Sequence, residues 1–185
     1  MKKTILVCSL LLAALPATSF ATVISMGNAS GNGTYSGSVT SSNAWIASNA
    51  LDGDAINFWT FDALANTSLS VLVESSGIEF GISVYRGLVD DFELLFSGFN
   101  NAGDFGDNLF VAGTNPVTGA VGTSLFDVVL PDAGHYTIAV GGEQGLDYPG
   151  KFNYTMTVNS VPEPGSLALM AIALLGMTLA LRKRA

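Results

Sequence analysis

The chain of 185 residues has very little of the residue types that usually carry chemistry: it contains one cysteine, one histidine and seven basic residues. The cysteine, Cys8, lies in an apolar segment near the N-terminus, so the chain after residue 21 has no thiol. This excludes a disulfide, a cysteine–metal site and a cysteine nucleophile from that part. A fold there must be held together by packing or by bound ions.

Basic residues are scarcest in the middle of the chain. Five of the seven lie at the two ends: Lys2, Lys3, Arg182, Lys183 and Arg184. Residues 22–160 keep only Arg86 and Lys151 against fourteen acidic residues, a net charge of −12. Such a surface repels nucleic acid and attracts cations or neutral hydrogen-bonding ligands. We therefore exclude nucleic-acid binding.

The N-terminal segment has the three parts of an export signal. Two lysines precede an apolar run over residues 5–15, and Ser19-Phe20-Ala21 supplies the small-x-small pattern that signal peptidase reads. A retained membrane anchor is the alternative, but the apolar run is too short to span a bilayer. We predict a signal peptide over residues 1–21, cleaved after Ala21.

The C-terminal segment contains a second apolar run, over residues 166–181, followed by the basic residues Arg182, Lys183 and Arg184. As a helix this run spans ~24 Å, somewhat less than the ~30 Å hydrocarbon core of a bilayer. The basic residues favour the cytoplasmic side. We predict a transmembrane helix that leaves everything upstream outside the inner membrane.

A short motif precedes this run. In Val161-Pro162-Glu163-Pro164 the two prolines disfavour helix and keep the backbone extended. Together the motif, the apolar helix and the basic end resemble the PEP-CTERM sorting signal of exopolysaccharide-producing Gram-negative bacteria, over residues 161–185. The resemblance implies recognition by an exosortase, a membrane-embedded enzyme that cuts near the motif. It also implies a transient stay in the inner membrane, with the ectodomain in the periplasm, before release to the cell surface or matrix.

The middle of the chain shows the period-two pattern of short strands. Runs of alternating residues cut by Gly, Asn and Asp occur at 56–61, 69–73, 80–85, 93–99, 125–130, 136–140 and 152–158. This pattern predicts an all-β domain over residues 51–160, an antiparallel β-sandwich or jelly roll of about eight strands. Residues 22–50 are rich in Gly, Ser and Asn, and are interpreted as a flexible lead-in or an exposed first strand.

The same region resembles bacterial pre-peptidase C-terminal domains, which are jelly rolls. The matching positions are an Asp-rich entry to an aromatic strand, a strand that ends in tyrosine, and a Pro-x-x-Gly-x-Tyr turn: Asp52, Asp54, Tyr85, Pro131, Gly134 and Tyr136. The resemblance covers residues 51–158. It implies an accessory, non-catalytic domain that binds matrix material, in some members with Ca²⁺.

Two loops are candidate Ca²⁺ sites. One offers Asp52, Asp54 and Asn57, and the other offers Asp104 and Asp107 among several asparagines. Ca²⁺ prefers carboxylate, amide and carbonyl oxygens in flexible loops. Neither loop has the spacing of an EF-hand, and ordinary turn formation explains the same residues. Calcium is therefore a candidate cofactor, and ordinary turn formation is the alternative explanation for both loops.

Aromatic residues are the candidates for a sugar-binding surface, because aromatic faces stack on sugar rings. Trp45, Trp59 and Tyr85 are the first candidates, with Phe105 and Tyr148 as further ones. The alternative for each is burial in the core, which is where large aromatics in strands usually lie. For Trp59, which stands between Phe58 and Phe61, the sequence favours neither interpretation.

Catalytic motifs are missing from the sequence. The single histidine, His135, could serve a hydrolase as a general base oriented by Asp132 or Asp127. There is no Gly-x-Ser-x-Gly elbow and no His-Glu-x-x-His helix. We predict a non-enzymatic, exported surface or matrix protein with a structural or adhesive role in the exopolysaccharide. A calcium-dependent carbohydrate-binding module is the first alternative, and a small secreted hydrolase using His135 is the second.

Overall fold

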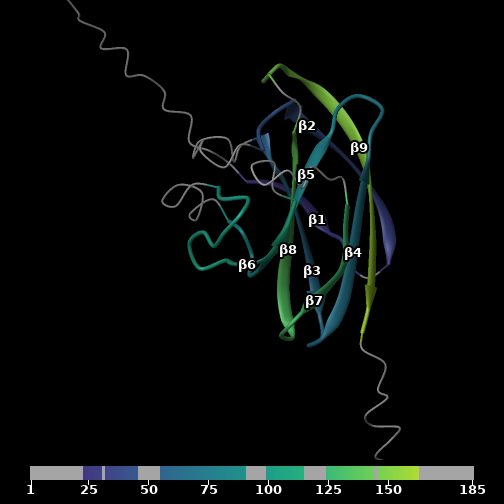
Figure 1. The fold of residues 1–185 in the computed structure, drawn as a ribbon, viewed down its shortest axis with the longest axis vertical. Coiled ribbons are helices and arrows are strands. Elements are labelled where there is room, and N and C mark those ends of the chain that lie inside the picture. Colours follow the sequence, from purple (N-terminus) through teal and green to yellow (C-terminus); the bar gives the residue numbers. More distant parts are fainter. Residues whose placement is uncertain are drawn as a thin grey trace, which may run out of the picture.

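The computed structural model describes residues 23–30, 32–45, 55–90, 99–114, 124–143 and 146–162. In this part of the chain there are nine strands and no helix. The strands are β1 (Ile24–Asn28), β2 (Gly33–Ser41), β3 (Asn57–Ala63), β4 (Thr67–Glu74), β5 (Phe80–Arg86), β6 (Leu109–Gly113), β7 (Ser124–Leu130), β8 (Gly134–Gly142) and β9 (Pro149–Val161). Figure 1 shows them stacked as two layers.

The two layers are a five-stranded sheet, in the order β1-β3-β8-β5-β6, and a four-stranded sheet, in the order β2-β9-β4-β7. Every neighbouring pair is antiparallel except β1 and β3, which are parallel. The predicted all-β sandwich of antiparallel strands is confirmed. Strand β6 was not predicted, and β9 is longer than the alternating run from which it was predicted.

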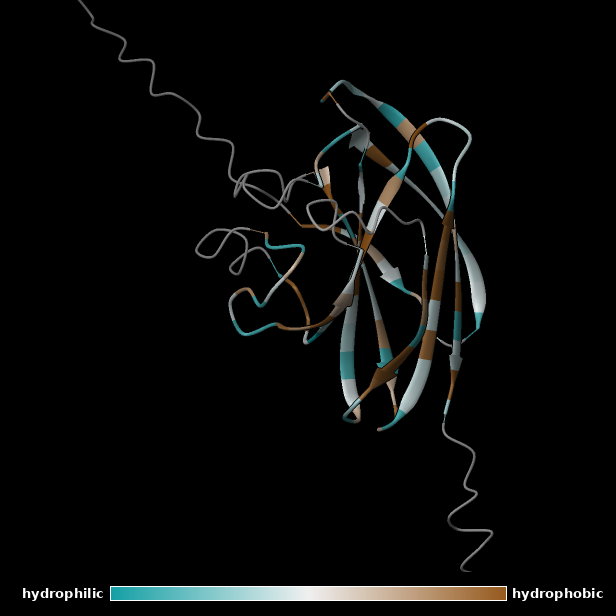
Figure 2. Cartoon of the chain, viewed as in Figure 1, coloured by the Kyte–Doolittle hydropathy of each residue, from teal (hydrophilic) through white to brown (hydrophobic). Residues whose placement is uncertain are grey.

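The main core lies between the sheets. In the four-stranded sheet, alternate residues of β4 and β9 point inward, among them Leu69, Val71, Met156 and Val158. Figure 2 shows the resulting alternation of hydrophobic and hydrophilic residues along these two strands. The outward positions are polar and partly exposed, as expected for an antiparallel sheet with one buried face.

The central strands of the five-stranded sheet are buried on both faces. Residues of β5 from Phe80 to Tyr85 are all buried, and so is most of β8. On the face turned away from the other sheet, a second apolar cluster is formed by the segment that includes Trp45 and by the loop that includes Phe99 and Phe105. These segments form a third layer, so β5 has no solvent-exposed face.

Several sequence predictions fall partly outside the described residues. The signal peptide, the tail helix and residues 93–98 lie outside them. Within the described part, no helix is long and apolar enough to cross a membrane. The segment 22–50, interpreted as a flexible lead-in or an exposed first strand, contains β1 and β2, one strand of each sheet.

Candidate functional site

The aromatic residues predicted as sugar platforms are buried. Trp45 and Tyr85 have no exposed surface, and Trp59 is 5 % exposed. The Trp45 indole donates to Thr114 O at 3.2 Å, and the Tyr85 hydroxyl donates to Asn100 O. Because no ring face is open to a ligand, the prediction of platforms at these three residues is wrong. Phe105 is also buried, and only Tyr148 is exposed.

Tyr85 illustrates how burial changes a side chain that the sequence assigned to the surface. Its ring packs edge-on against Phe105 at 4.8 Å and against Phe99 at 6.2 Å between centroids. Burial raises the pKa of its hydroxyl well above the ordinary value, only slightly opposed by a hydrogen bond with Ser83. Tyr85 therefore ties the covering loop to the sheet and acts as a structural residue.

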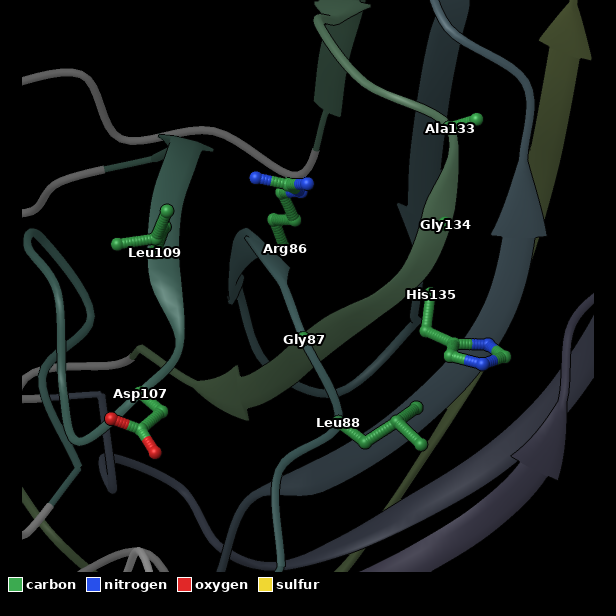
Figure 3. Close-up of a pocket in the computed structure, with 8 residues that line it drawn as sticks. All are labelled: Arg86, Gly87, Leu88, Asp107, Leu109, Ala133, Gly134 and His135. Carbon is green, nitrogen blue, oxygen red and sulfur yellow. The ribbon is translucent and has the colours of Figure 1, made fainter.

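The second candidate calcium loop, residues 99–108, uses two of its side-chain oxygens in hydrogen bonds to nearby backbone amides. Asp104 Oδ1 accepts the Phe110 amide at 2.6 Å, and Asn100 Oδ1 accepts the Ala102 amide at 3.1 Å. Asp107 is exposed and lines the pocket shown in Figure 3. Among the described residues there is no group of three acidic or histidine side chains that could hold a metal.

The first candidate calcium loop is only partly described. Asp52 and Asp54 lie outside the described residues, and Asn57 lies in β3, fully buried. The Asn57 amide nitrogen donates to Ser38 O at 2.8 Å and to the Tyr154 hydroxyl at 3.0 Å. Asn57 therefore faces the interior between the sheets and does not belong to a loop that could surround an ion.

The only histidine lies at a shallow pocket of about 290 Å³. His135 Nδ1 is 2.5 Å from Asp62, and Arg86 is 3.1 Å from Asp132. The predicted partner Asp132 is thus paired with Arg86, and Asp127 lies on β7 in the other sheet. Figure 3 shows the Arg86 and His135 side chains pointing apart.

The lining of this pocket bears directly on the hydrolase alternative. It consists of Arg86, Gly87, Leu88, Asp107, Leu109, Ala133, Gly134 and His135. None of these residues carries a hydroxyl or a thiol, so the serine nucleophile that the hydrolase alternative needs is not among the residues that line the pocket. The His135–Asp62 contact is solvent-exposed, at 64 % and 66 % of the two side chains, and such surface contacts contribute little to stability.

The outer side of the four-stranded sheet is a regular polar surface. Residues that point outward from β2, β9 and β4 are small and carry hydroxyl or amide groups; this polar face comprises Thr34, Ser36, Ser38, Ser68, Ser70, Asn153, Thr155, Thr157 and Asn159. The register places them in rows, such as Thr34 beside Thr157 and Ser36 beside Thr155.

A shallow depression of about 340 Å³ interrupts the polar face at one end. The polar side chains that line it come from β2, β9, the last residue of β4 and the turn that follows it: Ser36, Glu74, Ser75, Ser76, Asn153 and Thr155. Apart from Glu74 these are neutral groups that can donate or accept hydrogen bonds. The alternation that produces this surface is visible in the sequence of β9. Its continuation across β2 and β4 depends on strand order, which the sequence does not reveal.

Residues 160–184 match the model of the PEP-CTERM protein-sorting motif. The chain carries a PEP-CTERM sorting motif. Such a motif marks an exported protein for processing by an exosortase. The described structure includes Val161, the last residue of β9, and Pro162; Glu163, Pro164 and the basic end lie beyond it. The motif therefore begins directly at the end of the sandwich. No curated protein matches this PEP-CTERM chain.

Solved structures of exported proteins resemble the β-sandwich of this PEP-CTERM protein at low identity. PliG of Aeromonas hydrophila, a periplasmic inhibitor of g-type lysozyme, is 12 % identical with a TM-score of 0.46, covering 76 % of this chain and 98 % of that chain. The surface-associated copper-binding protein CorA of Methylomicrobium album BG8 is 14 % identical with a TM-score of 0.46, covering 75 % and 98 %.

A pre-peptidase C-terminal domain, the type that the sequence resembles, is also among these structures. The domain from the collagenase of Bacillus anthracis is 17 % identical with a TM-score of 0.40, covering 74 % of this chain and 96 % of that chain. At these identities and scores no resemblance transfers a ligand or an activity to this PEP-CTERM protein.

One carboxyl group of the sandwich has a strongly shifted pKa. Desolvation, with a smaller contribution from the charge of Glu79, raises the pKa of Glu143 to about 7. The two residues are joined by a hydrogen bond from Glu143 N to Glu79 O at 2.9 Å. Since the unfolded chain releases this proton near the ordinary value of 4.5, the folded state loses stability as the pH rises from about 4.5 to 7.

We therefore expect Glu143→Gln to stabilise the protein at pH 8 and to leave its stability unchanged at pH 4, where both states are protonated. The gain at pH 8 should be about 1 kcal/mol, because partial exposure screens the charge. Thermal unfolding at the two pH values measures it. Glu74→Gln, at an exposed position on β4, is the control, and an equal gain in both variants would contradict the assignment.

Proposed function

We propose that this protein is a non-catalytic surface or matrix protein, held transiently in the inner membrane by its tail and then released by an exosortase to the cell surface or the extracellular matrix. The observation that carries the proposal is the sorting motif at residues 160–184, directly after the last strand of a compact sandwich. The sandwich then corresponds to the exported part. Its role is structural or adhesive, in association with exopolysaccharide.

The polar face supports this adhesive role. Its hydroxyl and amide groups are complementary to the hydroxyl groups of neutral sugars, and their arrangement in rows across neighbouring strands suits an extended polymer. None of the residues that make up the polar face is aromatic, so its contacts are hydrogen bonds, each worth about 1 kcal/mol net. Binding would then depend on many repeated contacts along the polymer, as multivalent binding does.

Removing hydroxyl and amide groups from the depression should weaken binding. We expect the double variant Asn153→Ala/Thr155→Val to bind the producer's exopolysaccharide roughly tenfold more weakly, since two hydrogen-bonding groups are lost and the strand shape is kept. Co-sedimentation of the processed chain from the culture medium measures this.

The matched control is Thr60→Val, which also replaces a hydroxyl by a methyl group but lies on β3 of the other sheet. Equal binding by all three proteins would reject the polar face as the binding surface. Failure of the unmodified protein to bind at all would reject exopolysaccharide as the partner and would leave the sorting route unaffected.

Calcium-dependent binding is the second candidate function, supported by one observation. The side chain of Asn101 is fully buried in the 99–108 loop, and its Oδ1 atom has no hydrogen-bond partner among the residues that the structure describes. An amide oxygen in this state is available to a hard cation. If Ca²⁺ binds, EDTA should lower the melting temperature by several degrees and abolish co-sedimentation, because a ligand that binds only the folded state stabilises it. An unchanged melting curve would exclude this candidate.

A further inference from the structure

A group of exposed apolar side chains interrupts the outer side of the four-stranded sheet beside β7. We define this apolar corner as Leu72, Phe126, Val129 and Val161. Phe126, Val129 and Val161 are 68 %, 56 % and 57 % exposed, and Leu72 is half-buried. Val129 and Val161 both lie opposite Ser68, in one row across β7, β4 and β9. Since Ser68 points outward, both valines share its face of the sheet.

A local irregularity of β7 places Phe126 in the same corner. The register shifts between Leu69 and Val71, so that Phe126 and Asp127 together face Ser70. Asp127 has a φ of 52°, and its amide donates to Ser70 Oγ at 3.2 Å. A bulge of this kind redirects side chains. Leu125 and Val128 on either side pack against the core, and Phe126 is left exposed.

The apolar corner adjoins the point where the chain leaves the sandwich. Val161 belongs to the corner and is also the last residue of β9, at the lower end of the sandwich in Figure 1. Only residues 162–165 separate it from the apolar run 166–181. Fully extended, the link from Val161 to Ser166 reaches at most about 17 Å. When the run is in a bilayer, the corner must therefore lie close to the membrane surface, whose polar layer is roughly 5–8 Å deep on each side.

We infer that the apolar corner seats on the outer surface of the inner-membrane bilayer while the tail is still attached. This inference rests on the transient anchor of the proposed function. The tether raises the effective concentration of the corner at the bilayer to the millimolar range, so that weak intrinsic affinity is sufficient. Aromatic and aliphatic side chains such as Phe126 and Val129 are of the type that enters the headgroup boundary.

The negative charge around the apolar corner determines which lipid headgroups it can approach. Asp127 lies next to Phe126 in the bulge, and the ectodomain as a whole is strongly acidic. Anionic headgroups would repel this surface, whereas zwitterionic headgroups would not. A second copy of the chain is the less favoured occupant. Four side chains offer on the order of 400 Å², about half of the ~800 Å² per partner that stable interfaces bury.

The test places a fluorophore in the corner. The full chain with Cys8→Ser and Phe126→Cys is purified from membranes of a host without an exosortase, so that the tail stays attached, and is labelled with an environment-sensitive dye. It is then reconstituted into phosphatidylcholine vesicles. The matched control carries the label at Ser36→Cys, an exposed position of the polar face on β2. Flotation with the vesicles independently reports insertion of the tail.

We expect both labelled proteins to float, and only the label at residue 126 to shift to the blue and to be quenched by brominated lipid. Adding 50 % phosphatidylglycerol should reduce that quenching at least about twofold. If the protein floats but the label at residue 126 neither shifts nor is quenched, the docking is overturned and the anchor is not. A shift that grows with protein density and is not quenched by brominated lipid identifies a second copy and also overturns it. Failure to float overturns both the anchor and the docking.

Discussion

Gly81→Ala should destabilise the protein by about 3 kcal/mol although it adds only one methyl group. Gly81 on β5 lies directly opposite Gly141 on β8, and the Trp45 ring rests on this pair of glycines. A Cβ atom at Gly81 would overlap the indole. Because Trp45 is fully buried and its indole nitrogen is bonded to Thr114 O, the ring has no space into which it can move.

A double-mutant cycle separates this clash from a general effect of glycine replacement. Trp45→Ala alone should cost about 3–5 kcal/mol, as expected for a buried tryptophan. In that background Gly81→Ala should cost almost nothing, because its methyl group enters the space that the indole leaves. Urea unfolding of the four proteins gives the coupling energy. A Gly81→Ala penalty of the same size in both backgrounds would show that the indole is not the cause.

The same glycine pair shows why the sequence misplaced Trp45 and Tyr85. The alternation of residues 80–85 correctly predicted that Phe80, Ile82 and Val84 face the core. It could not predict that the opposite face is covered too, because the cover comes from segments far away in the chain. The one local signal was the small residues Gly81 and Ser83 on that face, which leave room for a ring from elsewhere. Hydrophobic periodicity does not show that small residues on one face of a strand leave space for a side chain from another segment.

Strands β1 and β2 were not both predicted from the sequence, for a different reason. Their glycine, serine and asparagine content resembles that of a linker, and isolated strands of this composition are weak. β2 is stabilised by pairing with β9 along most of its length and by the inward side chains of Tyr35 and Val39. The alternation that forms the polar face was therefore visible in the sequences of β9 and β4, and its continuation on β2 was not. The depression within it depends on three strands meeting, which is a tertiary property.

A buried polar cluster between the sheets leads to the second large prediction. The Tyr154 hydroxyl accepts hydrogen bonds from Trp59 Nε1 at 2.9 Å and from Asn57 Nδ2 at 3.0 Å. All three residues are buried, and they join β9 of one sheet to β3 of the other. Burial raises the pKa of the Tyr154 hydroxyl, against a smaller lowering by the two hydrogen bonds. The hydroxyl therefore stays protonated and is the common acceptor for two donors away from water.

Tyr154→Phe should destabilise the protein by about 3 kcal/mol, because it leaves two buried N–H groups without an acceptor, each at a cost of about 1–3 kcal/mol. The volume of the ring is kept, so the loss measures the hydrogen bonds rather than a cavity. Tyr35→Phe is the matched control: its hydroxyl bonds Ser30 O at 3.2 Å in an exposed position, and its removal should cost less than about 1 kcal/mol. Equal destabilisation by the two variants, measured by urea unfolding, would mean that the Tyr154 hydroxyl contributes no more than a surface group. It would also mean that apolar packing alone holds the sheets together at this point.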